Sequence, residues 1–123
     1  MTVETLAILM PGDMGHGCAI AFRENGFRVV TNLSGRSDRT KGLAAKAQIE
    51  DLGSFEEVAR QADLILSILP PENAIEQGRV FADAMVAAGS TPPYVDCNAI
   101  APSTTEKVGA EIARAGALFI DGG

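Results

Sequence analysis

Short apolar runs alternate with segments of helical periodicity along the whole chain, and this alternation constrains the fold more than any other feature. The run from Asp63 to Leu69 is almost entirely apolar, which is typical of a parallel strand covered by helices on both faces. Met14, Cys18 and Phe22 are spaced as on one face of a helix. The predicted strands span Thr5 to Met10, Phe27 to Thr31, Gln48 to Leu52, Asp63 to Leu69, Tyr94 to Cys97 and Ala117 to Asp121. The predicted helices span Met14 to Asn25, Arg39 to Ala47, Ser54 to about Gln61, Pro71 to about Ala88 and Ser103 to Ala115.

Strict alternation of strands and helices predicts right-handed β-α-β units and therefore a parallel sheet. Six strands are the number that a complete doubly wound α/β sheet of the Rossmann type needs, in the order 3-2-1-4-5-6. A length of 123 residues fits a single domain of this kind, spanning 1–123. Local signals agree with this reading, because Ser54 with Glu57 and Ser103 with Glu106 have the spacing of helix capping boxes.

Composition excludes several classes of function. The formal net charge of −6 disfavours binding to nucleic acid, because an acidic chain is repelled by phosphate backbones. No apolar run approaches the ~20 residues that span a membrane, and the N-terminus does not look like a signal peptide, so we expect a cytoplasmic location. In that reducing compartment, Cys18 and Cys97 are expected to be buried thiols rather than a disulfide. Neither has a Cys or His neighbour at ligand spacing, so no metal site is predicted.

The first predicted strand leads into the segment Met10-Pro11-Gly12-Asp13-Met14-Gly15, where a helix starts. A strand, a glycine turn and a helix in this order are the context of the dinucleotide fingerprint Gly-x-Gly-x-x-Gly. Gly12 would let the backbone approach a pyrophosphate, Gly15 would let the helix pack closely, and the helix N-terminus would face the phosphates. We therefore place Gly12, Asp13, Met14 and Gly15 in a cofactor site. Met10 replaces the first glycine, and the alternative is that both glycines serve only turn and packing.

Asn32 lies twenty residues after Gly12, where the fold would place the ribose of the adenosine half. No acidic residue stands at this strand end to bind a ribose 2′-hydroxyl. The segment instead carries three basic residues, Arg36, Arg39 and Lys41. Guanidinium and hydroxyl donors suit a 2′-phosphate, so we predict NADP, with NAD as the alternative, bound by Asn32, Ser34, Arg36 and Ser37. The opposing interpretation is a solvated basic turn, and Asp38 works against a phosphate.

Two further loops are predicted at the carboxyl edge of the sheet, where open α/β sheets bind their ligands. After the fourth strand, Leu69 and Pro70 begin a loop that its prolines make rigid, and the side chain of Asn73 offers an amide. After the fifth strand, Asn98 offers both a donor and an acceptor. We assign Leu69, Pro70, Asn73 and Asn98 to the cofactor site. The alternative is that Pro70 and Pro71 only start a helix and that Asn98 only caps a turn.

The remaining titratable residues give no catalytic assignment. His16 follows the glycine turn and is expected at the surface or beside the phosphates rather than as a general acid. Asp63, Asp96 and Asp121 recur at strand edges, but nothing in the sequence shows that they converge.

Taken in order and spacing, these motifs resemble the N-terminal NAD(P)-binding domain of the β-hydroxyacid dehydrogenase and 6-phosphogluconate dehydrogenase family. The resemblance covers the whole chain. Its parts are the Gly-x-Met-Gly turn (Gly12, Met14, Gly15), the Ile-Leu-Pro loop (Ile68 to Pro70), the Asp-x-x-x-Ile-x-Pro loop (Asp96 to Pro102) and the Phe-Ile-Asp strand (Phe119 to Asp121). Asn98-Ala99 resembles the Asn-Ser of the phosphogluconate enzymes more than the usual Ser-Thr of the family, which leaves the substrate open.

The resemblance implies NAD(P)-dependent oxidation of a β-hydroxyacid, or the reverse reduction. In the family, the glycine turn, the Leu-Pro loop and the polar residues after the fifth strand contact the cofactor. The family's catalytic lysine lies in a later helical domain that also forms the dimer and closes the substrate cleft. None of the three lysines here, Lys41, Lys46 and Lys107, matches it. We therefore expect a cofactor domain that is inactive alone and meets a small-molecule substrate only together with the helical domain.

Two other functions stay open at this point. A stand-alone, non-catalytic dinucleotide-binding module predicts a polar final strand, whereas the segment from Ala117 to Asp121 is largely apolar. A flavodoxin-like or methyl-transfer domain predicts five or seven strands rather than six. The apolar final strand is instead expected to leave exposed apolar surface, through which the isolated chain would self-associate.

Overall fold

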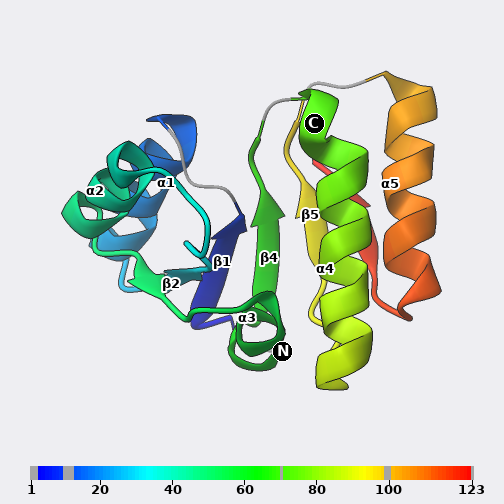
Figure 1. Cartoon of the computed structure of the whole chain (residues 1–123), viewed down its shortest axis with the longest axis horizontal. Coiled ribbons are helices and arrows are strands. Elements are labelled where there is room, and N and C mark those ends of the chain that lie inside the picture. The colour runs from blue at the N-terminus through cyan, green and yellow to red at the C-terminus, as the bar shows by residue number, and fades with distance from the viewer. Residues whose placement is uncertain (1–2, 10–12, 70, 99–100, 123) are drawn as a thin grey trace.

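The computed structural model describes residues 3–9, 13–69, 71–98 and 101–122. Within them, six strands form one sheet in the order β3-β2-β1-β4-β5-β6, and every neighbouring pair is parallel (Figure 1). The strands are β1 (Thr5–Leu9), β2 (Arg28–Thr31), β3 (Glu50–Asp51), β4 (Leu64–Ser67), β5 (Tyr94–Asp96) and β6 (Phe119–Asp121). The predicted doubly wound sheet and its strand order are confirmed.

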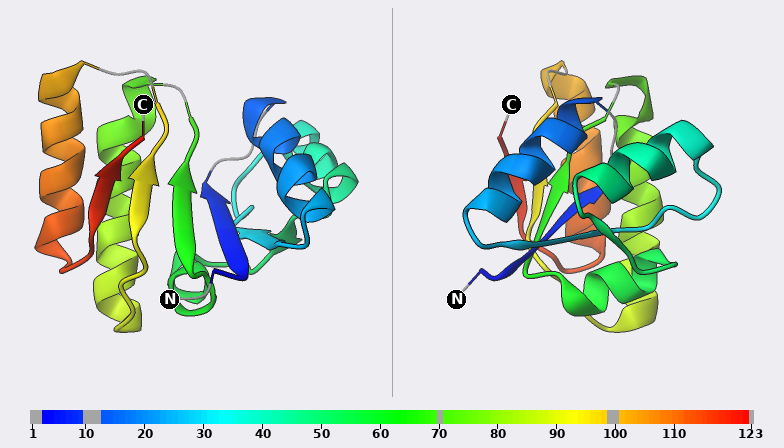
Figure 2. Two further views of the ribbon diagram at one scale, coloured as in Figure 1. Left: turned by 180° about the vertical axis from the view of Figure 1, so that it is seen from behind. Right: turned by 90° about the vertical axis from the view of Figure 1, so that its left-hand side faces the viewer.

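The helices lie in two layers on opposite faces of the sheet (Figures 1 and 2). On one face lie α1 (Asp13–Glu24) and α2 (Asp38–Lys46). On the other face lie α3 (Phe55–Gln61), α4 (Ala74–Ala88) and α5 (Pro102–Arg114), with the short 3-10 turn η1 (Pro71–Asn73) leading into α4. Each helix connects two parallel strands, which is the connection that a parallel sheet requires.

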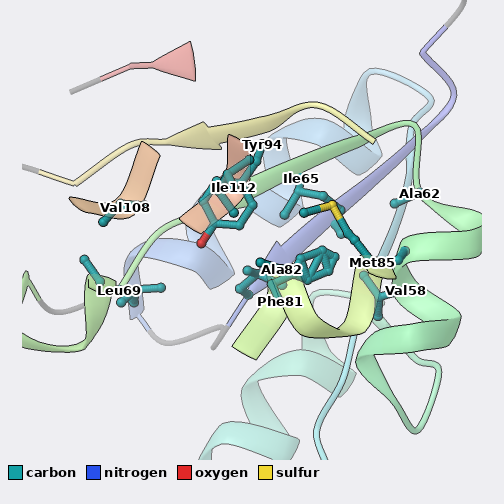
Figure 3. Close-up of a cluster of buried hydrophobic side chains, with 14 of the residues drawn as sticks. Val58, Ala62, Ile65, Leu69, Phe81, Ala82, Met85, Tyr94, Val108 and Ile112 are labelled. Atoms are coloured by element: carbon teal, nitrogen blue, oxygen red, sulfur yellow. The ribbon is translucent and has the colours of Figure 1, made fainter. Parts of the chain in front are cut away.

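The larger hydrophobic core lies between the sheet and helices α3, α4 and α5 (Figure 3). Ile65 of β4 and Tyr94 of β5 are partners in register, and both belong to this core. Phe81 of α4 is fully buried at the middle of an aromatic chain, with its ring centroid 5.8 Å from that of Phe55 and 6.0 Å from that of Tyr94. Aromatic rings at these separations add to the free energy gained by burying their surface.

A smaller core lies between the opposite face of the sheet and helices α1 and α2, and it includes Ile8, Val29 and Leu66. These helices cover only part of the sheet. Seen from behind, β4, β5 and β6 have no helix in front of them (Figure 2, left). Val95 is accordingly only half-buried, and 39% of Ile120 is exposed. On this face, the sheet is therefore open from β4 to β6.

The helix ends show which local signals the chain uses. The Ser54 hydroxyl caps α3 by accepting a hydrogen bond of 3.2 Å from the backbone N–H of Glu57, which confirms the hydroxyl half of the predicted capping box. The Glu57 carboxylate instead accepts from Arg60 Nη1 at 3.1 Å. The second predicted capping box is wrong. Helix α5 begins at Pro102, one residue before Ser103, and its cap residue Ala101 makes no side-chain hydrogen bond. The fixed φ of proline suits the first helical position and moves the start of the helix.

The core predicts how the free energy of unfolding responds to substitution in α4. Phe81→Ala removes a fully buried ring and should cost about 3–5 kcal/mol, because both the transfer free energy and the packing contacts are lost. Val86→Ala is the control on the same helix, since 59% of Val86 is exposed, and it should change stability by less than about 0.5 kcal/mol. Urea unfolding measures both variants. Equal effects would contradict the assignment of Phe81 to the core.

Candidate functional site

Strands β1 and β4 lie next to each other, but the chain leaves them toward opposite faces of the sheet. Helix α1, which follows β1, packs on the smaller core, whereas α4, which follows β4, packs on the larger core. Leu9 pairs with Ser67, so the carboxyl ends of the two strands stand side by side. Such a switch in the direction of winding is the place where open α/β sheets bind their ligands.

Helix α1, which follows the predicted phosphate-binding turn, begins at this switch point. Met10 and Gly12 lie outside the described residues, while Asp13, Met14 and Gly15 form the first turn of α1. Gly15 is buried, as a glycine that lets the helix pack closely should be. The first backbone N–H groups of α1 have no partner within the helix and carry its partial positive charge. Nearby, the Nε2 atom of His16 is buried and has no hydrogen-bond partner in the described part of the chain.

The segment after β2 is held in place by hydrogen bonds within the chain. The Asn32 Oδ1 atom accepts from the backbone N–H of Ser34 at 3.0 Å. The Asp51 Oδ1 atom, at the end of β3, accepts from the N–H groups of Leu33 at 3.1 Å and Gly53 at 2.9 Å. Sequence reasoning missed Asp51. The available signal was its place at the end of a strand that neighbours β2.

The hydroxyl groups predicted to bind a 2′-phosphate already have partners. Ser34 Oγ donates to the Gly53 carbonyl at 2.9 Å. Ser37 Oγ caps α2 by accepting from the Thr40 N–H at 3.2 Å and also lies 3.1 Å from the Thr40 hydroxyl. The Arg36 side chain differs from both, because its Nε atom is buried and has no hydrogen-bond partner among the described residues. Arg36 therefore keeps a buried donor available in this segment.

A hollow with a volume of about 500 Å³ opens beside Asn32. The start of α3 forms one of its walls, and the side of α4 that carries Val80 and Ala84 forms another. Glu56 and Asp83 also line it, so its rim is acidic while part of its wall is apolar. Sequence reasoning missed this hollow, because its walls come from three segments that only the tertiary fold brings together.

At the carboxyl ends of β4 and β5, the side chain of Asn98 joins the two strands. Asn98 is 7% exposed, and its Oδ1 atom accepts from the Leu69 N–H at 2.8 Å. Its Nδ2 atom donates to the Ser67 hydroxyl at 3.3 Å. The Leu69 side chain packs in the larger core. Pro70, the next predicted contact, lies outside the described residues, and the Asn73 side chain makes no capping hydrogen bond to α4.

Two of the three aspartates at strand ends converge. Asp96 and Asp121 are partners in the register of β5 and β6, whereas Asp63 lies at the opposite edge, where its Oδ2 atom accepts from the N–H groups of Glu4 and Thr5. Only 1% of Asp96 is exposed, and its Oδ2 atom has no hydrogen-bond partner among the described residues. Burial raises the pKa of the Asp96 carboxyl above its usual range, and the charge of Asp121 adds to this effect.

Other predicted features can be located in the structure. Cys18 and Cys97 are free thiols, each half-buried against the smaller core. Burial raises the pKa of the Cys97 thiol, as does the nearby charge of Asp96. Across the residues that the structure describes, no group of His, Cys, Asp and Glu side chains is arranged to hold a metal ion. Over the same residues, no helix combines the length and the apolar character needed to cross a membrane.

The strand order, the switch point between β1 and β4 and the helix that starts at Asp13 after β1 define a doubly wound dinucleotide-binding domain. The sequence profile of the NAD-binding domain of 6-phosphogluconate dehydrogenase matches residues 6–123. The chain therefore belongs to this family of NAD-binding domains.

The chain is also similar to individual proteins. A protein of Methanothermus fervidus, described as an uncharacterized 28.5 kDa protein in the 7S RNA 5′ region, is 24% identical over 87 residues, which are 71% of this chain and 33% of that protein. A conserved protein of unknown function, with structural similarity to 3-hydroxyacid dehydrogenases, is 26% identical and superimposes with a TM-score of 0.77 over 88% of this chain and 39% of its own.

The 3-hydroxyisobutyrate dehydrogenase of Mycobacterium tuberculosis shares the fold at 22% identity, with a TM-score of 0.78 over 98% of this chain and 40% of its own. The chain thus spans about two fifths of the length of these solved structures and a third of the Methanothermus protein.

Proposed function

We propose that the chain binds NADP, with NAD as the alternative, as the cofactor domain of an oxidoreductase that transfers hydride between a nicotinamide and a small β-hydroxyacid-type substrate. The observation that carries this proposal is the switch point between β1 and β4, because the first turn of α1 begins there. A helix start at the carboxyl edge of a parallel sheet is the usual pyrophosphate site of this fold. In this proposal the pyrophosphate lies over Gly12 to Gly15.

The adenosine half would lie beyond the carboxyl end of β2. The hollow beside Asn32 offers the apolar wall of Val80 and Ala84 to a flat ring, and the acidic Glu56 can accept hydrogen bonds from an exocyclic amine. The 2′-phosphate would bind Arg36, whose Nε–H has no partner within the described chain. In this proposal, the segment that positions Arg36 is held in shape by the side chains of Asn32, Ser34 and Ser37. These side chains already form hydrogen bonds inside the chain.

The nicotinamide half would lie toward the ends of β4 and β5, against Leu69, Pro70, Asn73 and Asn98. When bound, the nicotinamide supplies the hydride chemistry, and the protein supplies binding and orientation. None of the three lysines lies in the segments that follow β4 and β5, because Lys41 and Lys46 belong to α2, which follows β2, and Lys107 lies within α5. We therefore propose that residues 1–123 bind the cofactor without turning over a substrate, and that a helical domain of the family type provides the missing groups.

Arg36→Gln tests the choice of cofactor. The substitution removes a charge-assisted contact worth about 1.5–3 kcal/mol, so the Kd for NADP should rise roughly 10- to 100-fold while the Kd for NAD stays nearly unchanged. Isothermal titration with both dinucleotides measures the ratio. Lys107→Gln is the control, because it makes the same change of net charge at an exposed position of α5. Equal affinity of the wild-type chain for NADP and NAD would contradict the assignment of Arg36.

The pyrophosphate site can be tested within α1. Gly15→Val places a branched side chain at a buried position of its first turn and should reduce dinucleotide affinity by at least about tenfold. Gly17→Val is the matched control, because a Cβ atom at Gly17 meets no other atom within 4 Å. Circular dichroism should show both variants folded. Unchanged binding by a folded Gly15→Val chain would exclude this turn as the phosphate site.

An activity assay tests the separation of binding from catalysis. The chain should bind NADP but show no oxidation of small β-hydroxyacids when absorbance at 340 nm is followed, because none of its lysines lies in the segments that follow β4 and β5. A hydroxyacid dehydrogenase with both domains serves as the positive control. Measurable turnover by residues 1–123 would refute the proposal that the catalytic groups lie elsewhere.

A further inference from the structure

We propose that Asn98 is a positioning residue, which orders the loop after β4 for the dinucleotide, and that Asp96 in turn orients Asn98. This inference rests on the proposed function, because it concerns the same edge of the sheet. Beyond that function, we attribute the effect of Asn98 on dinucleotide binding to its hydrogen bond with the Leu69 N–H. A direct contact with the cofactor would then be secondary.

The hydrogen bonds of Asn98 support this role. Its carboxamide accepts from the Leu69 N–H at 2.8 Å and donates to the Ser67 hydroxyl at 3.3 Å. Its own backbone N–H donates to Asp96 Oδ1 at 2.8 Å. Ser67 is fully buried and Asn98 nearly so. A carboxamide can accept two hydrogen bonds and donate two, and Asn98 forms one of each kind inside the protein.

Asn98 contacts the loop after β4 through the backbone N–H of Leu69. β4 ends at Ser67, so the N–H of Leu69 lies beyond the last strand residue, and the Asn98 oxygen supplies its hydrogen-bond partner. A buried backbone N–H without a partner is costly, so loss of this oxygen would favour rearrangement at Leu69. Pro70 follows directly, and the described Asn73 lies four residues beyond Leu69 at the start of α4.

Asp96 completes the arrangement from the neighbouring strands. Its Oδ1 atom holds the Asn98 N–H, and its backbone carbonyl accepts from the Gly122 N–H at 2.8 Å, just past β6. The Cys97 N–H donates to the Ser67 carbonyl at 3.0 Å, which ties the ends of β5 and β4 together. A buried carboxyl group is costly in free energy unless it forms hydrogen bonds, and the Oδ1 atom of Asp96 accepts one from the Asn98 N–H. Asp96 therefore acts through Asn98 rather than through its charge.

Three variants of the chain test the inference, each checked for folding by circular dichroism. Asn98→Ala removes the oxygen that holds Leu69 and should increase hydrogen exchange at the Leu69 amide at least tenfold while weakening NADP binding roughly 3- to 10-fold. Asp96→Ala should have the same two effects in weaker form. Asp96→Asn keeps an oxygen for the Asn98 N–H and loses the charge, so it should retain both the slow exchange and the wild-type affinity.

The two readouts separate the outcomes. Weaker binding by Asn98→Ala with unchanged exchange at Leu69 would show a direct cofactor contact and overturn the positioning role. Faster exchange with unchanged binding would overturn it as well, because the ordered loop would then not matter to the ligand. An Asp96→Asn variant as impaired as Asp96→Ala would overturn the role of Asp96 alone. Failure of the wild-type chain to bind either dinucleotide would overturn the proposed function and this inference together.

Discussion

The parallel arrangement of all six strands is the constraint on which the rest of the structure depends. Parallel pairing places every carboxyl end at one edge of the sheet, and each crossover helix returns the chain to the other edge. Segments far apart in sequence, such as the first turn of α1, the residues after β2 and the ends of β4 and β5, are therefore brought to one edge. The change of face between α1 and α4 then singles out one position along that edge.

The two faces of the sheet are filled unequally. Fully buried aromatic and aliphatic side chains such as Phe81, Tyr94 and Ile65 form a continuous core beneath α3, α4 and α5. On the other face, α1 and α2 reach only part of the sheet, and Val95 and Ile120 keep some exposure. The exposure of Ile120 in β6 agrees with the apolar surface expected at the final strand, and the self-association expected from it stays a prediction.

Hydrogen bonds inside the chain change how the polar residues of the candidate site should be understood. The sequence predicted ligand contacts at Ser34, Ser37 and Asn98 from their residue types and positions. In the structure, however, each of these side chains forms a hydrogen bond with a nearby backbone group. Arg36 keeps a buried donor without a partner among the described residues. Ser34, Ser37 and Asn98 therefore hold the backbone of their loops in place, whereas Arg36 is the residue that we propose for the 2′-phosphate.

The sequence alone determined the architecture, because apolar periodicity and the alternation of elements depend on local properties that the residues carry with them. The strands near Ile65 and Tyr94 and the Ser54 cap could be predicted in this way, and the strand order followed from topology. Only the tertiary structure decided which polar groups form hydrogen bonds inside the protein, as Asn98 does. It also decided that Asp96 lies beside Asp121, while Asp63 lies at the other edge of the sheet. The physical reason is that hydrogen-bond partners and burial depend on contacts between distant segments, which no local pattern records.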